Sequence, residues 1–477
     1  MKRYKKFLRQ TVILIFCLLI VALFLSGCGG SSQDRAQGPI IILGLDGIEW
    51  DFVLPMIKKG RLPNIVKLMK RGYYGELETF APALSPSIWT SIVTGKVVKK
   101  HGISGFFRRF SGSGKITLIK STDRKTKALW NILSDYNKSV WSVGWWITFP
   151  VEKINGIMVS QTNALPQLDT PRGRNEKIWK GTLLKGVNGQ VYPPRRQNEM
   201  ITILNEVDED LPALLKRIFG EFRFPLSQLG QRLWDNCRWA FRADTTYYRI
   251  LGKLVKEDPL PDLTLLYFGG TDVVGHRFLR YMHPELYKHK PTKEQITNFG
   301  TIIEDYYAYC DRILEELLEI YGPDATFFVI SDHGMDPINL DAEFNPDAPW
   351  NANTSGGHKD NPPAFFLAAG PHIRKLPMNK PLQNLTRQDL EKVCTVFDIT
   401  PTILAMLRIP IGKDMDGKVV KKIFRDEFPI DIQPPPVPTH DTPEFLTNQK
   451  KRKKQKFISP EEKERLEQLR SLGYIDD

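Results

Sequence analysis

Short runs of apolar residues recur along the chain, and most of them end in a polar cluster. The first run spans residues 39–45 and ends in Asp46-Gly47. Similar runs span residues 263–268, 326–330 and 364–368. Continuous apolar runs of this length predict strands that are buried on both faces of a sheet. Three of the four runs lead directly into polar clusters, which is typical of an open α/β sheet with its chemistry at the carboxyl ends of the strands.

A helical pattern lies between the second and third of these runs. Apolar residues recur at three- and four-residue steps from Ile303 to Leu317. This spacing predicts an amphipathic helix packed on the sheet. Strands that alternate with such helices indicate a mainly parallel central sheet flanked by helices, so we expect an α/β fold.

The stretch from about residue 106 to residue 260 is rich in Trp, Arg and Pro and lacks catalytic-looking clusters. We expect it to contribute one extra strand, over residues 139–147, and a cap inserted over the active site. Trp145, Trp146 and Phe149 follow that strand. They line a substrate pocket under the cap or simply pack in the core, and the sequence leaves both readings open.

The chain changes character near residue 426. Three consecutive prolines at 434–436 precede a basic run at 450–454, and Ser459-Pro460 predicts a short helix after it. We interpret residues 426–477 as a Pro-rich, basic tail that is solvated. The basic run favours solubility over contact with anionic lipid.

The N-terminus has the pattern of an export signal. Five cations in the first ten residues precede an apolar run over residues 11–25, which is short for a membrane-spanning helix of about 20 residues. Leu25-Ser26-Gly27-Cys28 resembles the bacterial lipobox, in which the Cys is acylated and becomes the mature N-terminus. We expect a signal peptide over residues 1–27, lipidation of Cys28 and a flexible tether over residues 28–38.

This leader places the folded part outside the cytoplasm, even under the alternative of an uncleaved signal anchor. Gly29 follows the Cys, instead of the Asp associated with inner-membrane retention. We expect an exported lipoprotein anchored in the cell envelope, on the periplasmic or outer-membrane side.

The net charge and the cysteine content argue against a nucleic-acid partner and against a disulfide framework, respectively. The formal net charge of +13 falls to +8 without the five leader cations, so it requires no nucleic-acid partner, and no nucleic-acid-binding module is visible. Beyond Cys28 the chain has only Cys237, Cys310 and Cys394. Their odd number and wide spacing argue against a disulfide framework and predict packing roles.

Five polar clusters carry the candidate chemistry: Asp46-Gly47, Ser85-Pro86-Ser87, Asp272-x-x-Gly275-His276, Ser331-Asp332-His333-Gly334 and Gly356-Gly357-His358. Each is weak evidence alone. Together they supply three Asp and three His near predicted strand ends, the inventory of a two-metal site. Two cations about 4 Å apart suit phosphate esters, because they neutralise the charge that repels a nucleophile. Mixed imidazole and carboxylate ligands favour Zn²⁺, with Mn²⁺ as the second choice.

The order of these clusters resembles the alkaline phosphatase superfamily, and within it the type I phosphodiesterase/nucleotide pyrophosphatase family. The resemblance includes Thr94-Gly95 and His101-Gly102-Ile103 after the Ser85 cluster, and it covers roughly residues 39–422. It implies an alkaline-phosphatase-like catalytic domain over residues 39–425. It also implies that Ser85 attacks phosphorus and forms a phosphoseryl intermediate, which water hydrolyses. The implied ligands of one metal are Asp46, Ser85, Asp332 and His333, and those of the other are Asp272, His276 and His358.

The chain departs from this family near the nucleophile. Nucleotide pyrophosphatases carry Thr, Pro and Asn at the positions of Ser85, Ser87 and Phe106, so nucleotide specificity does not transfer. Arg108 or Arg109 is a candidate replacement for the missing Asn, and Phe106 joins Trp145 and Trp146 as a candidate pocket residue. Sulfatases require a C/S-x-P-x-R signature, which the chain lacks.

We therefore expect a metal-dependent hydrolase of phosphodiesters or phosphomonoesters. A transferase that passes a phosphoryl or head group to an alcohol is the enzymatic alternative. A non-catalytic binding protein on the same fold is the third reading. The sequence leaves the natural substrate and the oligomeric state open.

Overall fold

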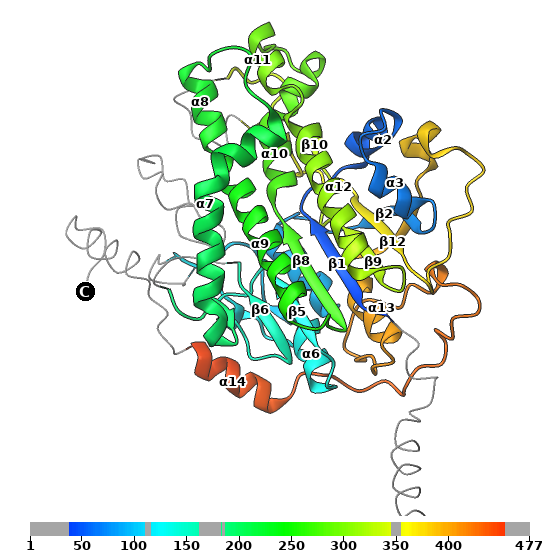
Figure 1. Cartoon of the computed structure of the whole chain (residues 1–477). Helices are drawn as coiled ribbons and strands as arrows, with labels where there is room; N and C mark the ends of the chain where they lie inside the picture. Colours follow the sequence, from blue (N-terminus) through cyan, green and yellow to red (C-terminus); the bar gives the residue numbers. More distant parts are fainter. Residues whose placement is uncertain (1–37, 110–115, 162–182, 184–186, 345–353, 454–477) are drawn as a thin grey trace, which may run out of the picture. The chain divides into compact units, whose positions relative to one another are not determined.

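A nine-stranded sheet forms the centre of the protein in the computed structural model, which describes residues 38–109, 116–161, 183, 187–344 and 354–453 (Figure 1). The sheet order is β13-β2-β12-β9-β1-β8-β5-β6-β7. Its strands are β1 (Ile40–Leu45), β2 (Tyr73–Glu78), β5 (Val140–Val143), β6 (Gly156–Val159), β7 (Val191–Tyr192), β8 (Leu263–Phe268), β9 (Thr326–Ile330), β12 (Ala364–Ala369) and β13 (Lys392–Thr395). Two-stranded ribbons join β3 (Phe107–Arg109) to β4 (Ile116–Leu118) and β10 (Asp336–Pro337) to β11 (Gly356–Gly357).

Helices flank the sheet on both faces. They are α2 (Trp50–Lys58), α3 (Pro63–Met69), α4 (Ser85–Thr94), α5 (Val98–His101), α6 (Leu129–Asp135), α7 (Gln197–Phe219), α8 (Gln228–Asp235), α9 (Arg238–Glu257), α10 (Gly270–Met282), α11 (Lys293–Phe299), α12 (Ile302–Tyr321), α13 (Ile399–Met406) and α14 (Pro443–Lys453).

Most strand pairs are parallel. The neighbours β9, β1, β8, β5 and β6 run in one direction, whereas β12 and β7 run against theirs. The four apolar runs noted in the sequence are β1, β8, β9 and β12. The predicted α/β fold with a mainly parallel central sheet flanked by helices is confirmed.

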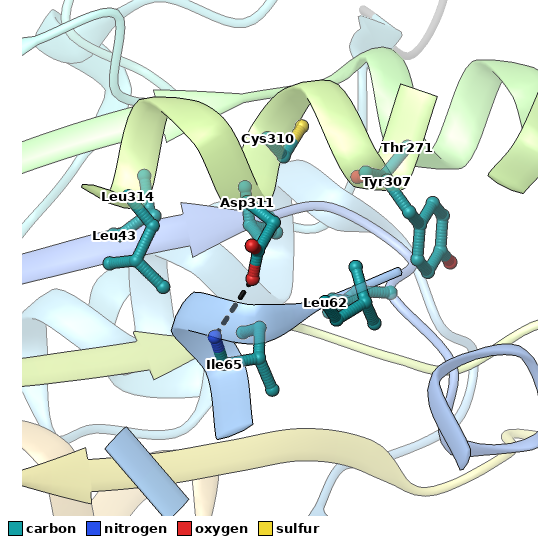
Figure 2. Close-up of a pocket in the computed structure, with 10 residues that line it drawn as sticks. Leu43, Leu62, Ile65, Thr271, Tyr307, Cys310, Asp311 and Leu314 are labelled. Carbon is teal, nitrogen blue, oxygen red and sulfur yellow. Dashed lines mark hydrogen bonds between the residues drawn. The ribbon is translucent and has the colours of Figure 1, made fainter. Parts of the chain in front are cut away.

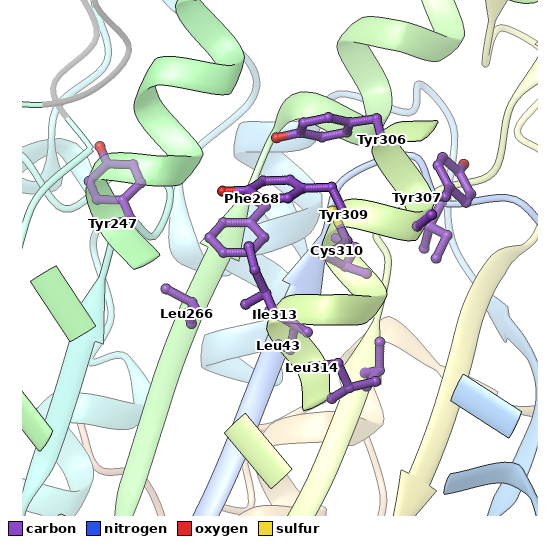
Figure 3. Close-up of a cluster of buried hydrophobic side chains, with 14 of the residues drawn as sticks. Leu43, Tyr247, Leu266, Phe268, Tyr306, Tyr307, Tyr309, Cys310, Ile313 and Leu314 are labelled. Atoms are coloured by element: carbon purple, nitrogen blue, oxygen red, sulfur yellow. The ribbon is translucent and has the colours of Figure 1, made fainter. Parts of the chain in front are cut away.

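Side chains of β1 alternate between two apolar cores. Ile40 and Ile42 pack in the core that includes α4, α6 and α13, whereas Ile41, Leu43 and Leu45 pack in the core that includes α3, α9, α10 and α12. Figure 3 shows part of the second core, where Leu43 and Phe268 meet the aromatic face of α12. A strand buried on both faces needs apolar residues at every position, which explains the unbroken run in the sequence.

A buried carboxylate also orders this second core. Asp311 of α12 accepts hydrogen bonds from the backbone N–H groups of Asn64 and Ile65, in the first turn of α3 (Figure 2). Leu62, which precedes α3, supplies no side-chain cap, so Asp311 satisfies donors that the helix start would leave open. The pocket drawn in Figure 2 is a cavity of only 10 Å³ with mostly apolar walls, and it is part of the core.

The predicted strand over residues 139–147 is shorter in the structure, where β5 ends at Val143. Gly144 has a φ of +73° and Ile147 a φ of +56°, so the backbone turns directly after the strand. A Cβ on Gly144 would lie 2.5 Å from the ring of Tyr247, which restricts the turn to glycine. The turn places Trp145 and Trp146 at the carboxyl edge of the sheet.

Residues 106–260 contribute β5, β6 and β7 to the main sheet, together with α6 to α9. Whether part of this region also acts as a cap stays a prediction.

The C-terminal segment is solvated only in part. Lys450, Lys451 and Lys453 are exposed, as the composition predicts, whereas Arg452 is docked on the fold. The basic run forms the end of α14, and Arg452 donates to the carbonyls of Pro150 and Val151 at 2.7 and 3.0 Å. Gln449 of the same helix is buried. The expected leader, Cys28, the tether up to residue 37 and the helix expected after Ser459 lie outside the described residues.

Two further features bear on the sequence predictions. Cys237, Cys310 and Cys394 are buried and unbridged. Among the helices described here, none is both long enough and apolar enough to cross a membrane.

Candidate metal centre and nucleophile

Strand register brings the predicted site residues to one edge of the sheet. Leu45 pairs with Phe268 and Gly44 with Ile330, so β1, β8 and β9 end level with one another. Asp46, Asp272 and Asp332 follow these ends. The carboxylates are therefore neighbours although they are far apart in the sequence.

The antiparallel strand β12 brings the remaining residues to the same edge. Ala364 begins β12 opposite Leu77 near the end of β2, and Phe366 pairs with Ile330 at the end of β9. The loop that contains His358 precedes β12, and the loop that leads to Ser85 follows β2. Both loops therefore start or finish beside the three carboxylates.

Asp46, Asp332 and His333 form the first candidate metal group, and all three are buried. His333 Nε2 lies 3.4 Å from Asp46 Oδ1 and 3.3 Å from Asp332 Oδ2. Asp332 Oδ1 accepts a hydrogen bond from the backbone of Gly47, 3.4 Å away. Gly47 has a φ of +64°, and a Cβ there would lie 3.1 Å from Asp272, so the Asp-Gly turn permits the close approach.

The second group predicted from the sequence is Asp272, His276 and His358. His276 Nε2 lies 3.1 Å from Asp272 Oδ1, one helical turn along α10, and His358 Nε2 lies 4.0 Å from the same oxygen. His333 also belongs to a possible ligand set with Asp272 and His358, and its ring stacks on that of His358 at 3.8 Å. The two groups therefore adjoin at His333, and the structure brings all six predicted Asp and His residues together.

Backbone carbonyls orient the imidazoles. His276 Nδ1 lies 2.7 Å from the carbonyl oxygen of Gly356, and His333 Nδ1 lies 2.9 Å from that of Gly334. His358 hydrogen-bonds to the backbone of Ala83. A ring N–H that donates to a carbonyl leaves the other nitrogen as a lone pair, which is the usual arrangement of a metal-ligating histidine.

Three atoms of the first group fit a divalent cation. Asp46 Oδ1, Asp332 Oδ2 and His333 Nε2 are buried and form no hydrogen bond within the described part of the chain. Buried polar atoms without partners are costly, and two carboxylate oxygens facing an imidazole lone pair repel it. A divalent cation among them satisfies all three, and the mixed N/O donor set suits zinc.

The pKa values of the clustered carboxylates also support the binding of a cation here. Burial and the neighbouring Asp272 raise the pKa of Asp46, and burial and Asp46 raise the pKa of Asp332 well above its ordinary value. Burial also acts to raise the pKa of Asp272, but the imidazoles of His276, His358 and His333 together outweigh it, and the pKa falls below its usual range. The site carries more negative charge than its own cations balance, as expected for a site that binds metal.

Ser85 is the first residue of α4 and is largely buried. Trp89, four residues later, donates from Nε1 to Asp46 Oδ2 at 3.1 Å. Residues i and i+4 lie on the same face of a helix, so Ser85 lies on the same face of α4 as Trp89. The contact of His358 with Ala83 places the loop before Ser85 at the second group. A helix N-terminus also favours a bound anion.

The residues predicted to line a substrate pocket do not share one environment in the structure. Trp146 donates from Nε1 to Asp46 Oδ2 at 3.4 Å, and Phe106 packs edge-on against it at 5.7 Å. Trp145 is fully buried and packs against Trp89. Arg108 and Arg109 lie in β3, but the described structure does not extend to their side chains.

Several residues around the site carry no sequence motif. Tyr267 donates to Asp46 Oδ2 beside Trp89 and Trp146. Glu49 is buried and accepts from the backbone of Met335 at 3.0 Å, which ties the turn after β1 to the turn after β9. Asp244 of α9 accepts from Gly269 and Gly270 at the start of α10. In the sequence, these residues resemble core aromatics or ordinary helix residues. Only their contacts in the structure reveal that they hold Asp46 and the turns around the site.

Comparisons with known proteins identify the family and the fold of the chain. A model of the type I phosphodiesterase/nucleotide pyrophosphatase family matches residues 40–396, well over half of the chain. The wild-type alkaline phosphatase PafA has a similar structure, with a TM-score of 0.51 at 12% identity over 82% of this chain and 99% of that chain. Human ectonucleotide pyrophosphatase/phosphodiesterase 5 is similar with a TM-score of 0.44 at 13% identity over 81% of this chain and 100% of that chain.

One curated relative is a 2,3-bisphosphoglycerate-independent phosphoglycerate mutase from Nostoc punctiforme, 30% identical over 144 residues. That alignment covers 30% of this chain and 23% of the mutase, so the chain spans under a quarter of the relative's length. The likeness to PafA confirms the alkaline-phosphatase-like fold. The family match confirms the resemblance seen in the sequence, and the chain belongs to the type I phosphodiesterase/nucleotide pyrophosphatase family.

Proposed function

We propose that this protein hydrolyses phosphodiesters or phosphomonoesters with Ser85 as the nucleophile and two divalent cations, preferably Zn²⁺, as cofactors. The observation that carries the proposal is a set of three buried atoms that form no hydrogen bond with any described residue: Asp46 Oδ1, Asp332 Oδ2 and His333 Nε2. They lie at the sheet edge where α4 begins. Family membership supports phosphoric ester hydrolysis as the reaction class.

The residues divide into two holding groups. Asp46, Asp332 and His333 would hold one cation together with Ser85 Oγ, and Asp272, His276 and His358 would hold the other. When bound, the cations supply positive charge that offsets the charge of the phosphate and favours ionisation of the serine hydroxyl.

Ser85 begins α4, so its Oγ and the first backbone N–H groups of the helix meet the substrate together. In the first step a bond forms between Ser85 Oγ and phosphorus, the ester P–O bond breaks, and the leaving alcohol takes up a proton. In the second step water attacks phosphorus, the Oγ–P bond breaks, and Ser85 regains its proton. The balance is one water consumed for each ester cleaved.

The test uses bis-nitrophenyl phosphate and nitrophenyl phosphate as substrates for the wild type and for Ser85→Ala, with the metal content of both proteins measured. We expect the substitution to lower turnover by a factor of at least about 10³ while metal is retained. Undiminished turnover in Ser85→Ala would rule out the nucleophile. A wild type that holds no metal and cleaves neither ester would favour the non-catalytic reading.

The same assay addresses phosphoryl transfer. A transferase is the alternative to a hydrolase, and the curated relative named as a phosphoglycerate mutase favours keeping it under test. With nitrophenyl phosphate as the substrate, we expect nitrophenol and phosphate to appear in equal amounts when an acceptor alcohol such as glycerol is added. Formation of glycerol phosphate at the expense of free phosphate would favour the transferase.

We further propose that the enzyme acts at the cell envelope, anchored through acylated Cys28. The Leu25-Ser26-Gly27-Cys28 sequence supports this placement. Labelled palmitate should be incorporated into the wild type and not into Cys28→Ala, and the membrane fraction should lose the variant. Labelling of both proteins would contradict lipidation at this residue.

A further inference from the structure

One oxygen of the Asp46 carboxylate accepts three side-chain hydrogen bonds. Trp89 Nε1 lies 3.1 Å and Trp146 Nε1 lies 3.4 Å from Oδ2, and the hydroxyl of Tyr267 also donates to it. Oδ1 of the same carboxylate accepts none within the described residues and lies 3.4 Å from His333 Nε2. The two oxygens of one side chain therefore have different surroundings.

This difference limits how Asp46 can bind a cation. A carboxylate has about four lone-pair sites, two on each oxygen, and three donors more than fill those of Oδ2. The three donors come from three different elements: Trp89 from α4, Trp146 from the turn after β5, and Tyr267 from β8. Only Oδ1 is left for a metal, so Asp46 would bind through one oxygen.

The donors are held rigidly. Trp89 and Tyr267 meet edge to face at 5.3 Å, and Trp146 meets Tyr267 at 6.1 Å. Interlocked aromatic rings leave the acceptor oxygen little freedom to turn.

We propose that Trp89, Trp146 and Tyr267 form an aromatic donor cage that holds Asp46 as a one-oxygen metal ligand and thereby sets the affinity of the first metal site. This inference rests on the proposed metal centre. The cage residues are positioning residues, because they act through Asp46. Partners of this kind typically contribute a factor of 10–100 to metal affinity.

Trp145, the residue before Trp146, provides a matched control for the three donors. Its ring packs on both Trp89 and Tyr267, at 4.9 and 6.3 Å between ring centroids. Its Nε1 forms no hydrogen bond within the described part of the chain. Trp145→Phe therefore changes the packing of the same cluster without removing a donor to Asp46.

The experiment measures the affinity of the full-length protein for Zn²⁺ alone, by competition with a chromogenic chelator, in the wild type, Trp146→Phe, Tyr267→Phe and Trp145→Phe. We expect one of two zinc equivalents to bind 10–100-fold more weakly in Trp146→Phe and Tyr267→Phe. We expect Trp145→Phe to stay within about 3-fold of the wild type. Tyr267→Phe keeps the ring, so it serves if Trp146→Phe fails to fold.

Equal losses in Trp145→Phe and the two cage variants would overturn the inference, since packing alone would explain them. Unchanged affinity in the cage variants would overturn it as well. The proposed function can fail separately: a wild type that binds zinc with the expected variant pattern but cleaves no phosphate ester supports the cage and contradicts the hydrolase. A wild type that binds no zinc overturns both.

Discussion

At the scale of single residues, acidic and imidazole side chains after apolar runs were predictable from the sequence, because strand ends collect such groups. Asp46 and Asp332 follow two buried strands, and Asp272 lies in the first turn of α10 after a third. The donors around Asp46 were not predictable in this way. A buried Trp or Tyr has the same sequence signature whether its polar atom bonds to a metal ligand or to nothing, as Trp146 and Trp145 illustrate.

Replacing a ligand carboxylate by an amide should raise the stability of the metal-free protein and at the same time weaken zinc binding. Asp332 is fully buried and faces Asp46, so Asp332→Asn removes a charge that the metal-free protein carries at a cost. We expect the metal-free variant to be more stable than the metal-free wild type by about 1 kcal/mol or more, and to bind zinc far more weakly. Thermal melts with and without chelator measure both effects. A metal-free variant less stable than the wild type would contradict the account of charge crowding.

A second prediction concerns His101, which is buried behind α4. Ile103 N–H donates to its Nδ1 at 3.1 Å, and its Nε2 lies 2.9 Å from Ser91 Oγ. Burial lowers the pKa of His101 to about 3, so the folded protein holds the neutral ring. The stability that this neutral ring provides is complete above the unfolded pKa of about 6.5 and is lost as the pH falls towards 3.

We expect the unfolding free energy of the wild type to drop by up to about 1.4 kcal/mol per pH unit from this residue below pH 6. His101→Gln should be less stable at neutral pH and should show a shallower acid slope, by about one proton. Urea unfolding at several pH values measures the slope. Identical slopes for the two proteins would show that His101 does not titrate in this way.

At the scale of elements, the sequence located β1, β8, β9, β12 and the long helix α12 well, because each carries a continuous or periodic apolar pattern. It did not predict β2, β6, β7 or β13. It placed the end of β5 too late, since Trp145 and Trp146 extend the apolar pattern beyond the turn at Gly144. It also missed the docking of α14, whose composition is that of a solvated helix. That docking depends on acceptors near Pro150, about 300 residues earlier, which no local pattern reveals.

Docking of α14 gives an element-scale prediction. Arg452 donates to two backbone carbonyls and lies 3.3 Å from Glu152, itself bonded to Arg124. Arg452→Ala should reduce the unfolding free energy by about 1–3 kcal/mol, because buried acceptors lose their donor. Lys450→Ala, at an exposed position on the same helix, should stay within about 0.5 kcal/mol of the wild type. Equal effects of the two substitutions in thermal melts would count against specific docking of Arg452.

At the scale of the whole molecule, the fold class and family were accessible from the sequence, whereas the order of nine strands was not. Apolar runs identify buried strands but carry no record of which strands are neighbours. The antiparallel strand β12 illustrates this limit: it inserts between β2 and β9, and in doing so brings the loops of Ser85 and His358 to the carboxylates. The proposed chemistry therefore depends on topology as much as on the motifs.

The central claim is that six Asp and His residues hold two cations beside Ser85. Anomalous scattering at the zinc edge, from crystals of the full-length protein grown with Zn²⁺, tests it most directly. We predict two peaks about 4 Å apart, one within about 2.2 Å of Asp46 Oδ1 and His333 Nε2 and the other next to Asp272 and His276. Zinc at other positions only, or no anomalous peak at this edge of the sheet, would contradict the account.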